Sequence, residues 1–172
     1  MFSYADPPIP RNEEARLEIL RQYEILDTEA EKLFDDITAL AASVCETPIS
    51  LLTFIDRDRQ WIKSKVGLPV HETSRDIAFC AHAICGEDLF VVPDALKDER
   101  FAQNPLVTTD PTIRFYAGMP LFTPQGHALG ALCVIDRVPR ELSEEQKAKI
   151  RALAQSAMIL LEMRLGRPNP RV

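Results

Sequence analysis

One stretch decides the fold: Ile49-Ser-Leu-Leu-Thr-Phe-Ile55, then Asp56-Arg-Asp-Arg59, then Gln60-Trp-Ile-Lys-Ser-Lys-Val66. The first run is β-branched and apolar on both faces, which predicts a central strand. The charged quartet predicts a turn. In the last run Ile62 and Val66 share one face, and the other face holds Trp61, Lys63 and Lys65. This alternation predicts a half-exposed partner strand that pairs antiparallel with the first.

Two helices are predicted before this hairpin. Asn12 can cap a helix that runs to about Leu26, since asparagine favours the N-cap position. Thr28 and Glu31 have the spacing of a capping box, and an apolar stripe at the helical period follows them. The second helix is therefore expected to end before Pro48.

After the hairpin the pattern predicts a short helix, three strands and a last helix. The helix covers residues 75–84, and the strands cover 89–92, 113–121 and 128–135, with a possible bulge at Gly130. Residues 93–111 form a long polar segment, with one helical turn expected near Phe101, and segments of this kind are usually functional or mobile. Ser143-Glu-Glu-Gln146 is another capping box, and the helix after it reaches about Leu161. The order predicts an α+β domain with an antiparallel sheet and the helices gathered on one side.

Length, charge and cysteine usage limit the classes of function that the chain can have. The chain has 172 residues, with 20 Lys and Arg against 26 Asp and Glu, so its net charge is −6. One domain fits this length, and an acidic chain without a basic run is not expected to bind nucleic acid. We expect no membrane span and no secretory signal, hence a cytoplasmic protein with reduced cysteines. Cys80, His82 and Cys85 would point in different directions on a helix, so no metal site is expected.

The ends of the chain differ in composition from its middle. Three prolines fall within the first ten residues, and two more follow Arg167 among polar residues. Residues 1–11 and 166–172 are therefore predicted to be flexible tails, with a single domain over residues 12–165.

Several words of the sequence resemble the GAF domain, a small-molecule-sensing module, over roughly residues 14–165. They are Ile49-Ser-Leu-Leu-Thr-Phe-Ile-Asp56, Phe79-Cys-Ala-His-Ala-Ile84, Val91-Val-Pro-Asp94, Asp98-Glu-Arg-Phe101, Ile113-Arg-Phe-Tyr-Ala-Gly-Met-Pro-Leu121 and Leu129-Gly-Ala-Leu-Cys-Val-Ile-Asp136. They look most like the modules attached to bacterial histidine kinases and diguanylate cyclases. The resemblance implies a six-stranded antiparallel sheet with helices packed on one face, and a lid helix and long loop over a ligand cavity on the other.

Departures from the family's patterns narrow the range of ligands that we expect. Ile135-Asp136 stands where the cyclic-nucleotide-binding members carry Asn-Lys, so cyclic nucleotides are not expected. The Cys-His pair that attaches bilin in phytochrome-type modules is absent, and no cofactor is expected. The free methionine sulfoxide reductases of the family carry cysteines on loops around the pocket, whereas Cys45 and Cys133 fall on a predicted helix and strand. A thiol-dependent enzyme of that kind is kept as an alternative.

The ligand-pocket candidates come from the lid helix and the rim of the expected cavity. They are Arg75, Asp76, Phe79, Cys80, His82, Asp94, Arg114 and Tyr116. Cys80 and Cys85 are either redox-active thiols or small buried hydrophobic residues. The arginines and aspartates either bind a polar ligand or form salt bridges that hold the long loop.

Strand alternation separates the residues of the strand predicted over 113–121. Arg114 and Tyr116 are expected on the cavity face, and Phe115, Ala117, Met119 and Leu121 beneath the terminal helices. An acid such as Asp76 or Asp94, or an anionic ligand, should then lie against Arg114, and Arg114→Ala should abolish ligand binding.

The sequence therefore predicts a non-catalytic sensory or regulatory GAF domain in bacterial signal transduction, for example in a two-component system. It would bind an unidentified small molecule, or form a homodimer through its terminal helices, and thereby control an attached or partner output domain. A ligand-free dimerisation module is the other alternative. The enzyme hypothesis is disfavoured because no nucleophile stands beside a general base.

Overall fold

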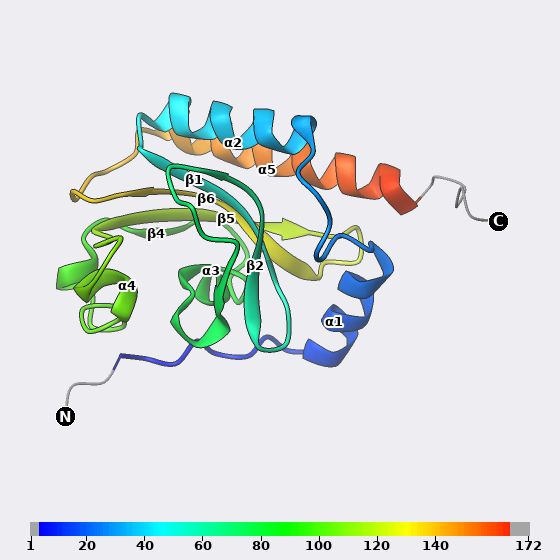
Figure 1. The fold of residues 1–172 in the computed structure, drawn as a ribbon, viewed down its shortest axis with the longest axis horizontal. Helices are drawn as coiled ribbons and strands as arrows, with labels where there is room; N and C mark the ends of the chain where they lie inside the picture. The colour runs from blue at the N-terminus through cyan, green and yellow to red at the C-terminus, as the bar shows by residue number, and fades with distance from the viewer. Residues whose placement is uncertain (1–3, 166–172) are drawn as a thin grey trace.

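The computed structural model describes residues 4–165, which form a six-stranded antiparallel sheet in the order β3-β2-β1-β6-β5-β4 (Figure 1). The strands are β1 (Ile49–Ile55), β2 (Arg59–Val66), β3 (Glu72–Ser74), β4 (Phe90–Val92), β5 (Phe115–Phe122) and β6 (Ala128–Asp136). The α-helices are α1 (Glu13–Gln22), α2 (Lys32–Cys45), α3 (Phe79–Ala83), α4 (Pro105–Thr108) and α5 (Glu144–Leu165). Two short 3₁₀ helices are η1 (Arg75–Ile77) and η2 (Ala95–Lys97). The α+β class and the six-stranded sheet are confirmed, and β3 is the strand that residue patterns alone did not predict.

The hairpin of β1 and β2 is antiparallel as predicted, but it contains a bulge. Leu52 pairs with Ser64 and Thr53 pairs with Ile62, so Lys63 is an extra residue in β2. Because of this bulge, Lys63 and Ser64 both reach towards α2: Ser64 Oγ lies 2.7 Å from Thr38 Oγ1. The prediction of a half-exposed strand is therefore wrong for most of β2, where residues 60–64 are buried.

Lys63 also explains why the predicted capping box at Thr28 and Glu31 does not form. Its buried ammonium group donates to Thr28 Oγ1 at 2.8 Å and to the Glu29 carbonyl at 2.5 Å. It also lies 2.6 Å from a carboxylate oxygen of Glu31. A buried ammonium group needs such partners. The side chains of Thr28 and Glu31 therefore pair with Lys63 and form no capping box, and α2 begins only at Lys32.

The other two predicted helix starts have different outcomes. Asn12 immediately precedes α1 but makes no side-chain cap hydrogen bond, since its backbone is in the left-handed region at φ 60°. The helix ends at Gln22, short of Leu26. The capping box before α5 is confirmed: the Ser143 N–H donates to Gln146 Oε1 at 2.9 Å, and the Gln146 N–H donates to Ser143 Oγ at 3.1 Å.

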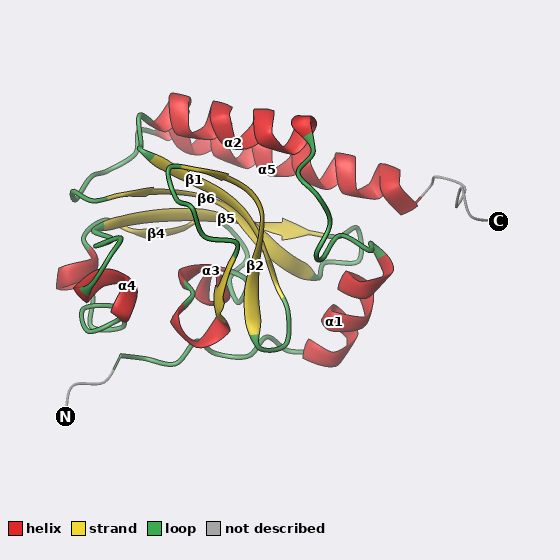
Figure 2. Cartoon of the chain, in the orientation of Figure 1, coloured by secondary structure: helices red, strands yellow, loops and turns green. Residues whose placement is uncertain are grey.

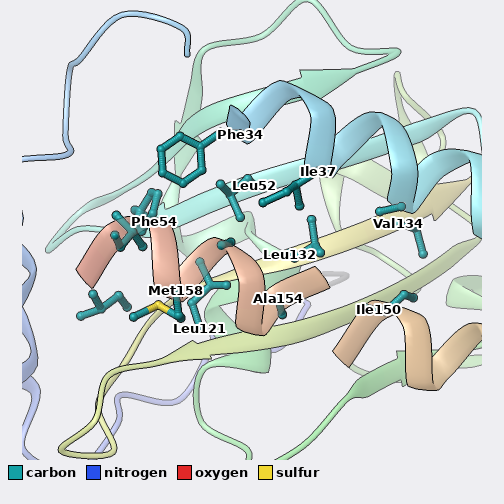
Figure 3. Close-up of a cluster of buried hydrophobic side chains, with 14 of the residues drawn as sticks. Phe34, Ile37, Leu52, Phe54, Leu121, Leu132, Val134, Ile150, Ala154 and Met158 are labelled. Atoms are coloured by element: carbon teal, nitrogen blue, oxygen red, sulfur yellow. The ribbon is translucent and has the colours of Figure 1, made fainter. Parts of the chain in front are cut away.

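Helices α2 and α5 lie side by side across one face of the sheet (Figure 2). Between helices and sheet lies a buried apolar cluster, whose members in Figure 3 include Phe34, Ile37, Leu52, Leu132, Ile150 and Met158. Phe115, Ala117 and Leu121 of β5 belong to it, with Met119 packed against it, as alternation predicted. Helix α1 lies near one end of the sheet, so α5 has α2 rather than α1 as its neighbour.

The opposite face of the sheet is covered by α3, α4 and the loops around them, over a second buried apolar cluster. The predicted lid helix over residues 75–84 is broken into η1 and α3. Ala78 between them is extended, at φ −76° and ψ 124°, and Ser74 caps η1 by accepting from the Asp76 N–H. The long polar segment 93–111 likewise holds two short helices, η2 and α4.

A bulge occurs at Gly130 as predicted. Pro120 pairs with Ala131 and Phe122 with Ala128, so Leu129 and Gly130 together oppose Leu121. On its other side Gly130 pairs with Phe54 of β1. The two strands approach so closely there that a Cβ on Gly130 would lie 1.8 Å from the Thr53 carbonyl oxygen.

The first predicted tail, residues 1–11, is described from Tyr4 on. Residues 4–11 run along the surface of the domain, and the Ala5 N–H donates to the Arg100 carbonyl at 3.2 Å. Residues 1–3 and the predicted tail 166–172 lie outside the described part of the chain. Among residues 4–165, no helix combines the length and apolar character that crossing a membrane requires.

Candidate functional site

A cavity of about 130 Å³ lies between the sheet and the α3 side of the molecule. The sheet contributes side chains from β1, β2, β3, β5 and β6, and α3, α4 and the loops at residues 68–70 and 110–113 close over them. The lining is largely apolar: Leu51, Gln60, Ile62, Leu68, Pro69, Val70, Thr73, Phe79, Cys80, Leu106, Asp110, Pro111, Ile113, Tyr116, Cys133 and Ile135. Three of the predicted site residues, Phe79, Cys80 and Tyr116, therefore meet at one cavity.

Tyr116 crosses the sheet face beside a glycine. A Cβ on Gly118 would lie 2.1 Å from the Tyr116 hydroxyl oxygen, so only glycine leaves room for this ring. The hydroxyl donates to Cys80 Sγ at 3.0 Å, and the ring packs 5.2 Å from that of Phe79. These contacts fix the position of α3 over the sheet.

The thiols of this cavity are buried. Burial opposes ionisation of Cys80, but hydrogen bonds from Cys133, Thr53 and Tyr116 lower the pKa of its thiol below the ordinary value. Burial raises the pKa of Cys133, and its hydrogen bond to Cys80 raises it further. The pKa of the Cys80 thiol is thus lowered, but the side chain has almost no access to solvent.

Cys85 has the opposite combination of exposure and pKa. It is exposed beyond the end of α3, and its thiol donates to the Pro8 carbonyl at 3.3 Å. Partial burial raises the pKa of this thiol. A reactive thiol needs both access and a lowered pKa, and neither Cys80 nor Cys85 combines the two.

The predicted residues Arg75 and Asp76 do not line the cavity. Arg75 is buried and directed towards α1, where its guanidinium lies 2.5 Å from Glu13 and donates to the Asp56 carbonyl at 3.0 Å. Asp76 is exposed, and its hydrogen bond runs from its backbone N–H to Ser74 Oγ at 3.3 Å.

His82 and Asp94 also lie outside the cavity lining. The His82 ring packs edge-on against Phe101 at 4.7 Å, and burial, assisted by the nearby Arg100 charge, lowers its pKa to about 4. Asp94 caps η2 by accepting from the Leu96 N–H at 3.1 Å. Both side chains therefore have local structural roles.

The placement of Arg114 on the cavity wall is wrong. Its guanidinium donates to the carbonyls of Val107 at 2.8 Å and Ile113 at 3.0 Å, and it forms no ion pair with Asp76 or Asp94. The physical reason is that β5 begins at Phe115, so strand alternation does not extend to Arg114. The loss of ligand binding expected for Arg114→Ala has no basis in this geometry.

Sequence reasoning missed Gln60, Thr73 and Leu106 as cavity residues. Gln60 could have been found, because period-two alternation places it on the face of Ile62. Thr73 lies on the unpredicted strand β3, and Leu106 on the unpredicted helix α4. Within residues 4–165, no group of three or more His, Cys, Asp and Glu side chains is arranged to hold a metal ion.

Comparison with known proteins agrees with this architecture. The family model of the GAF domain matches residues 29–161, so the chain belongs to the GAF domain family. A cyclic di-GMP phosphodiesterase of Pseudomonas aeruginosa is 44% identical over 155 residues, which are 90% of this chain and 26% of that protein. The chain thus spans about a quarter of the length of this relative.

Solved structures show the same fold. The GAF domain of an Acinetobacter phosphoenolpyruvate-protein phosphotransferase superposes with a TM-score of 0.67 at 19% identity, covering 91% of this chain and 98% of that one. A domain of a two-component sensor histidine kinase from Sinorhizobium meliloti gives 0.61 at 12% identity, covering 79% and 94%. A type II free methionine-R-sulfoxide reductase from Thermoplasma acidophilum gives 0.62 at 12% identity, covering 86% and 96%.

Cyclic GMP and cyclic AMP are expected to bind no more tightly than millimolar. A cavity of about 130 Å³ is smaller than the roughly 150 Å³ that holds one benzene molecule, and a cyclic nucleotide is several times larger. Isothermal titration calorimetry checks this expectation. Micromolar binding of either nucleotide would show that the cavity opens widely in solution.

Proposed function

We propose that this chain is a non-catalytic sensory or regulatory GAF domain that binds a small molecule between the sheet and α3. The observation that carries the proposal is the apolar cavity of about 130 Å³, roofed by the short helix α3 and the irregular segment around α4. Ligand pockets are typically concave and mostly apolar, with a few polar groups that orient the ligand. A roof made of short segments gives a ligand a route into the cavity.

We further propose that the domain controls an attached or partner signalling output in the cytoplasm. This is supported by the 44% identity to part of a cyclic di-GMP phosphodiesterase, because the matched part is 26% of that protein and leaves room for other domains. A role in a two-component system is the other proposal of this kind, supported at the level of fold by the histidine kinase domain.

A second proposed function is dimerisation through the layer formed by α2 and α5. Their outer surfaces expose Leu33 and Leu40 on α2 and Ile159 and Met163 on α5, each more than half accessible. Exposed apolar side chains at such spacing favour helix pairing across a two-fold axis. Dimerisation and ligand binding use opposite faces of the sheet, so the two functions are compatible.

Native mass spectrometry of the purified protein tests the ligand-binding proposal. We expect a small molecule to be retained by the wild type and lost in Leu106→Trp, because an indole at this lining position would fill the cavity. Leu96→Trp is the matched control, since Leu96 is exposed and does not line the cavity. Equal retention by both variants would contradict the proposed location.

The enzyme alternative is tested by turnover of free methionine sulfoxide with dithiothreitol as the reductant. We expect no turnover above the protein-free rate, because the thiol with the lowered pKa, Cys80, is buried. Turnover that disappears in Cys80→Ser or in Cys85→Ser would overturn the non-catalytic proposal.

A further inference from the structure

Among the described residues, Asp110 is the one charged member of the cavity lining. It follows α4 and is exposed while it lines the cavity, which places it at the mouth, where the cavity meets solvent. Arg137 donates to the Pro111 carbonyl at 3.1 Å, and Arg114 donates to the Val107 carbonyl at 2.8 Å. Neither arginine forms an ion pair with Asp110. The negative charge at the mouth is thus left without a neutralising partner within residues 4–165.

The rest of the lining offers no partner to an anion. The part of the lining that the structure describes contains no Lys, Arg or His. The Tyr116 hydroxyl donates its single proton to Cys80 Sγ, and the Thr73 hydroxyl gives its proton to the Ser74 carbonyl at 3.2 Å. An anionic ligand would therefore be buried without a counter-charge, and it would meet Asp110 at the mouth. If a ligand of this cavity carries a charge, we expect the charge to be positive.

The size and the walls of the cavity limit the rest of the ligand. A dry cavity of roughly 150 Å³ holds benzene, which amounts to about 25 Å³ for each carbon atom. By this measure a cavity of about 130 Å³ accommodates roughly five such atoms. Leu51, Ile62 and Ile135 are among the apolar walls, which favour carbon atoms in the ligand. The fitting ligand body is therefore a short aliphatic chain.

We propose that the cavity takes up short aliphatic ammonium compounds, with the alkyl body inside the cavity and the ammonium group beside the Asp110 carboxylate. The inference rests on the proposed ligand-binding function and adds the chemical class of the ligand. The charged end stays at the mouth, so it keeps part of its hydration while the alkyl chain leaves water. The net charge of −6 on the chain adds a general attraction for cations.

The test compares n-butylammonium with 1-butanol, which has the same number of non-hydrogen atoms and no charge. NMR titration at low ionic strength follows the lining methyl groups of Ile62 and Ile113. The measured quantity is the ratio of the two affinities in the wild type against that ratio in Asp110→Asn, so that differences in transfer from water cancel. We expect the preference for n-butylammonium to fall by about threefold or more in the variant, because the ion pair is lost. The fall should be smaller at high ionic strength, because salt screens an exposed pair.

Two further variants separate a local effect of charge from a general one. Asp110→Glu keeps the carboxylate and is expected to keep most of the preference for n-butylammonium. Asp76→Asn is the matched control, since Asp76 is exposed but does not line the cavity, and it should leave the ratio unchanged. An equal fall in Asp76→Asn would show only the general attraction for cations and would overturn the role of Asp110.

The other outcomes distinguish this inference from the proposed binding function. If 1-butanol shifts the cavity methyl groups, and n-butylammonium either fails to do so or binds with a ratio unchanged in Asp110→Asn, the preference for a cation is wrong while small-molecule binding stands. If neither butyl compound shifts these methyl groups but xenon does, the ligand class is wrong and the cavity remains a binding site. If none of the three shifts them, the proposed binding function fails together with the inference.

Discussion

Gly130→Ala is expected to abolish the folded state at 25 °C, or to lower the free energy of unfolding by more than about 4 kcal/mol. The added Cβ would lie 1.8 Å from the Thr53 carbonyl oxygen, 2.7 Å from the carbonyl carbon and 2.8 Å from Phe54 Cα. All three atoms belong to the backbone of β1, which cannot rotate away as a side chain could. The strands β1 and β6 lie at the centre of the sheet, so separating them disrupts the core on both faces.

The measurement is urea unfolding followed by circular dichroism, with Gly86→Ala as the matched control. A Cβ on Gly86 would meet its nearest atom at 3.6 Å, which is an ordinary contact. The free energy of unfolding of this variant is therefore expected to lie within about 0.5 kcal/mol of that of the wild type. Equal stability of the two variants would show that β1 and β6 are not as close as described.

Glu13→Gln is expected to cost about 3 kcal/mol of unfolding free energy at pH 7, because it removes the carboxylate shared by two buried arginines. Arg16 Nε lies 2.8 Å from Glu13 Oε2, and Arg75 approaches Oε1 at 2.5 Å. Arg16 and Arg75 are only 1% and 5% exposed. Without the carboxylate, two positive charges face each other where water cannot solvate them.

The neighbouring residue provides the control. Glu14 forms an exposed ion pair with Arg57 at 2.8 Å, so Glu14→Gln is expected to leave the free energy of unfolding nearly unchanged. If the two variants were equally stable in urea unfolding, the buried cluster would contribute no more than a surface ion pair.

The effect of Glu13 should also depend on pH. Burial alone raises the pKa of Glu13, but hydrogen bonds and positive charge from Arg16 and Arg75 lower it from 4.5 to about 2. A lowered pKa contributes stability that is complete above pH 4.5 and is lost as the pH falls towards 2. The difference between the wild type and Glu13→Gln should therefore shrink over that interval. A constant difference would contradict the shared-carboxylate explanation.

The fold could be predicted wherever a pattern depends on neighbours in sequence. The apolar run of β1, the alternation of Phe115, Ala117 and Leu121, and the reciprocal cap of Ser143 and Gln146 are such patterns, and the structure has all of them. The capping box at Thr28 failed because Lys63, distant in sequence, takes the same groups as its partners. No local pattern could show this competition.

The site was less predictable for the same reason. Alternation pointed to Tyr116, and the resemblance to the family pointed to Phe79 and Cys80; all three line the cavity. Arg75 and Arg114 suggested ligand contacts because each looked like an isolated charge in the sequence. In the structure Arg75 pairs with the carboxylate of Glu13, which is distant in sequence, and Arg114 donates to backbone carbonyls. Thr73 and Leu106 were missed because they lie on β3 and α4, which are too short to show a periodic pattern in the sequence.

The most direct test of the central claim is a xenon titration of the methyl-labelled protein followed by NMR, because xenon binds in dry apolar cavities and is small enough for a cavity of about 130 Å³. The methyl groups of Leu51, Ile62 and Ile113 line the cavity, whereas those of Ile37, Leu132 and Ile150 lie in the cluster beneath α2 and α5. We predict saturable chemical-shift changes in the first set, little change in the second, and loss of the effect in Leu106→Trp but not in Leu96→Trp. Shifts concentrated beneath α2 and α5, or no saturable shift at the cavity methyl groups, would contradict the claim that this cavity is the ligand site.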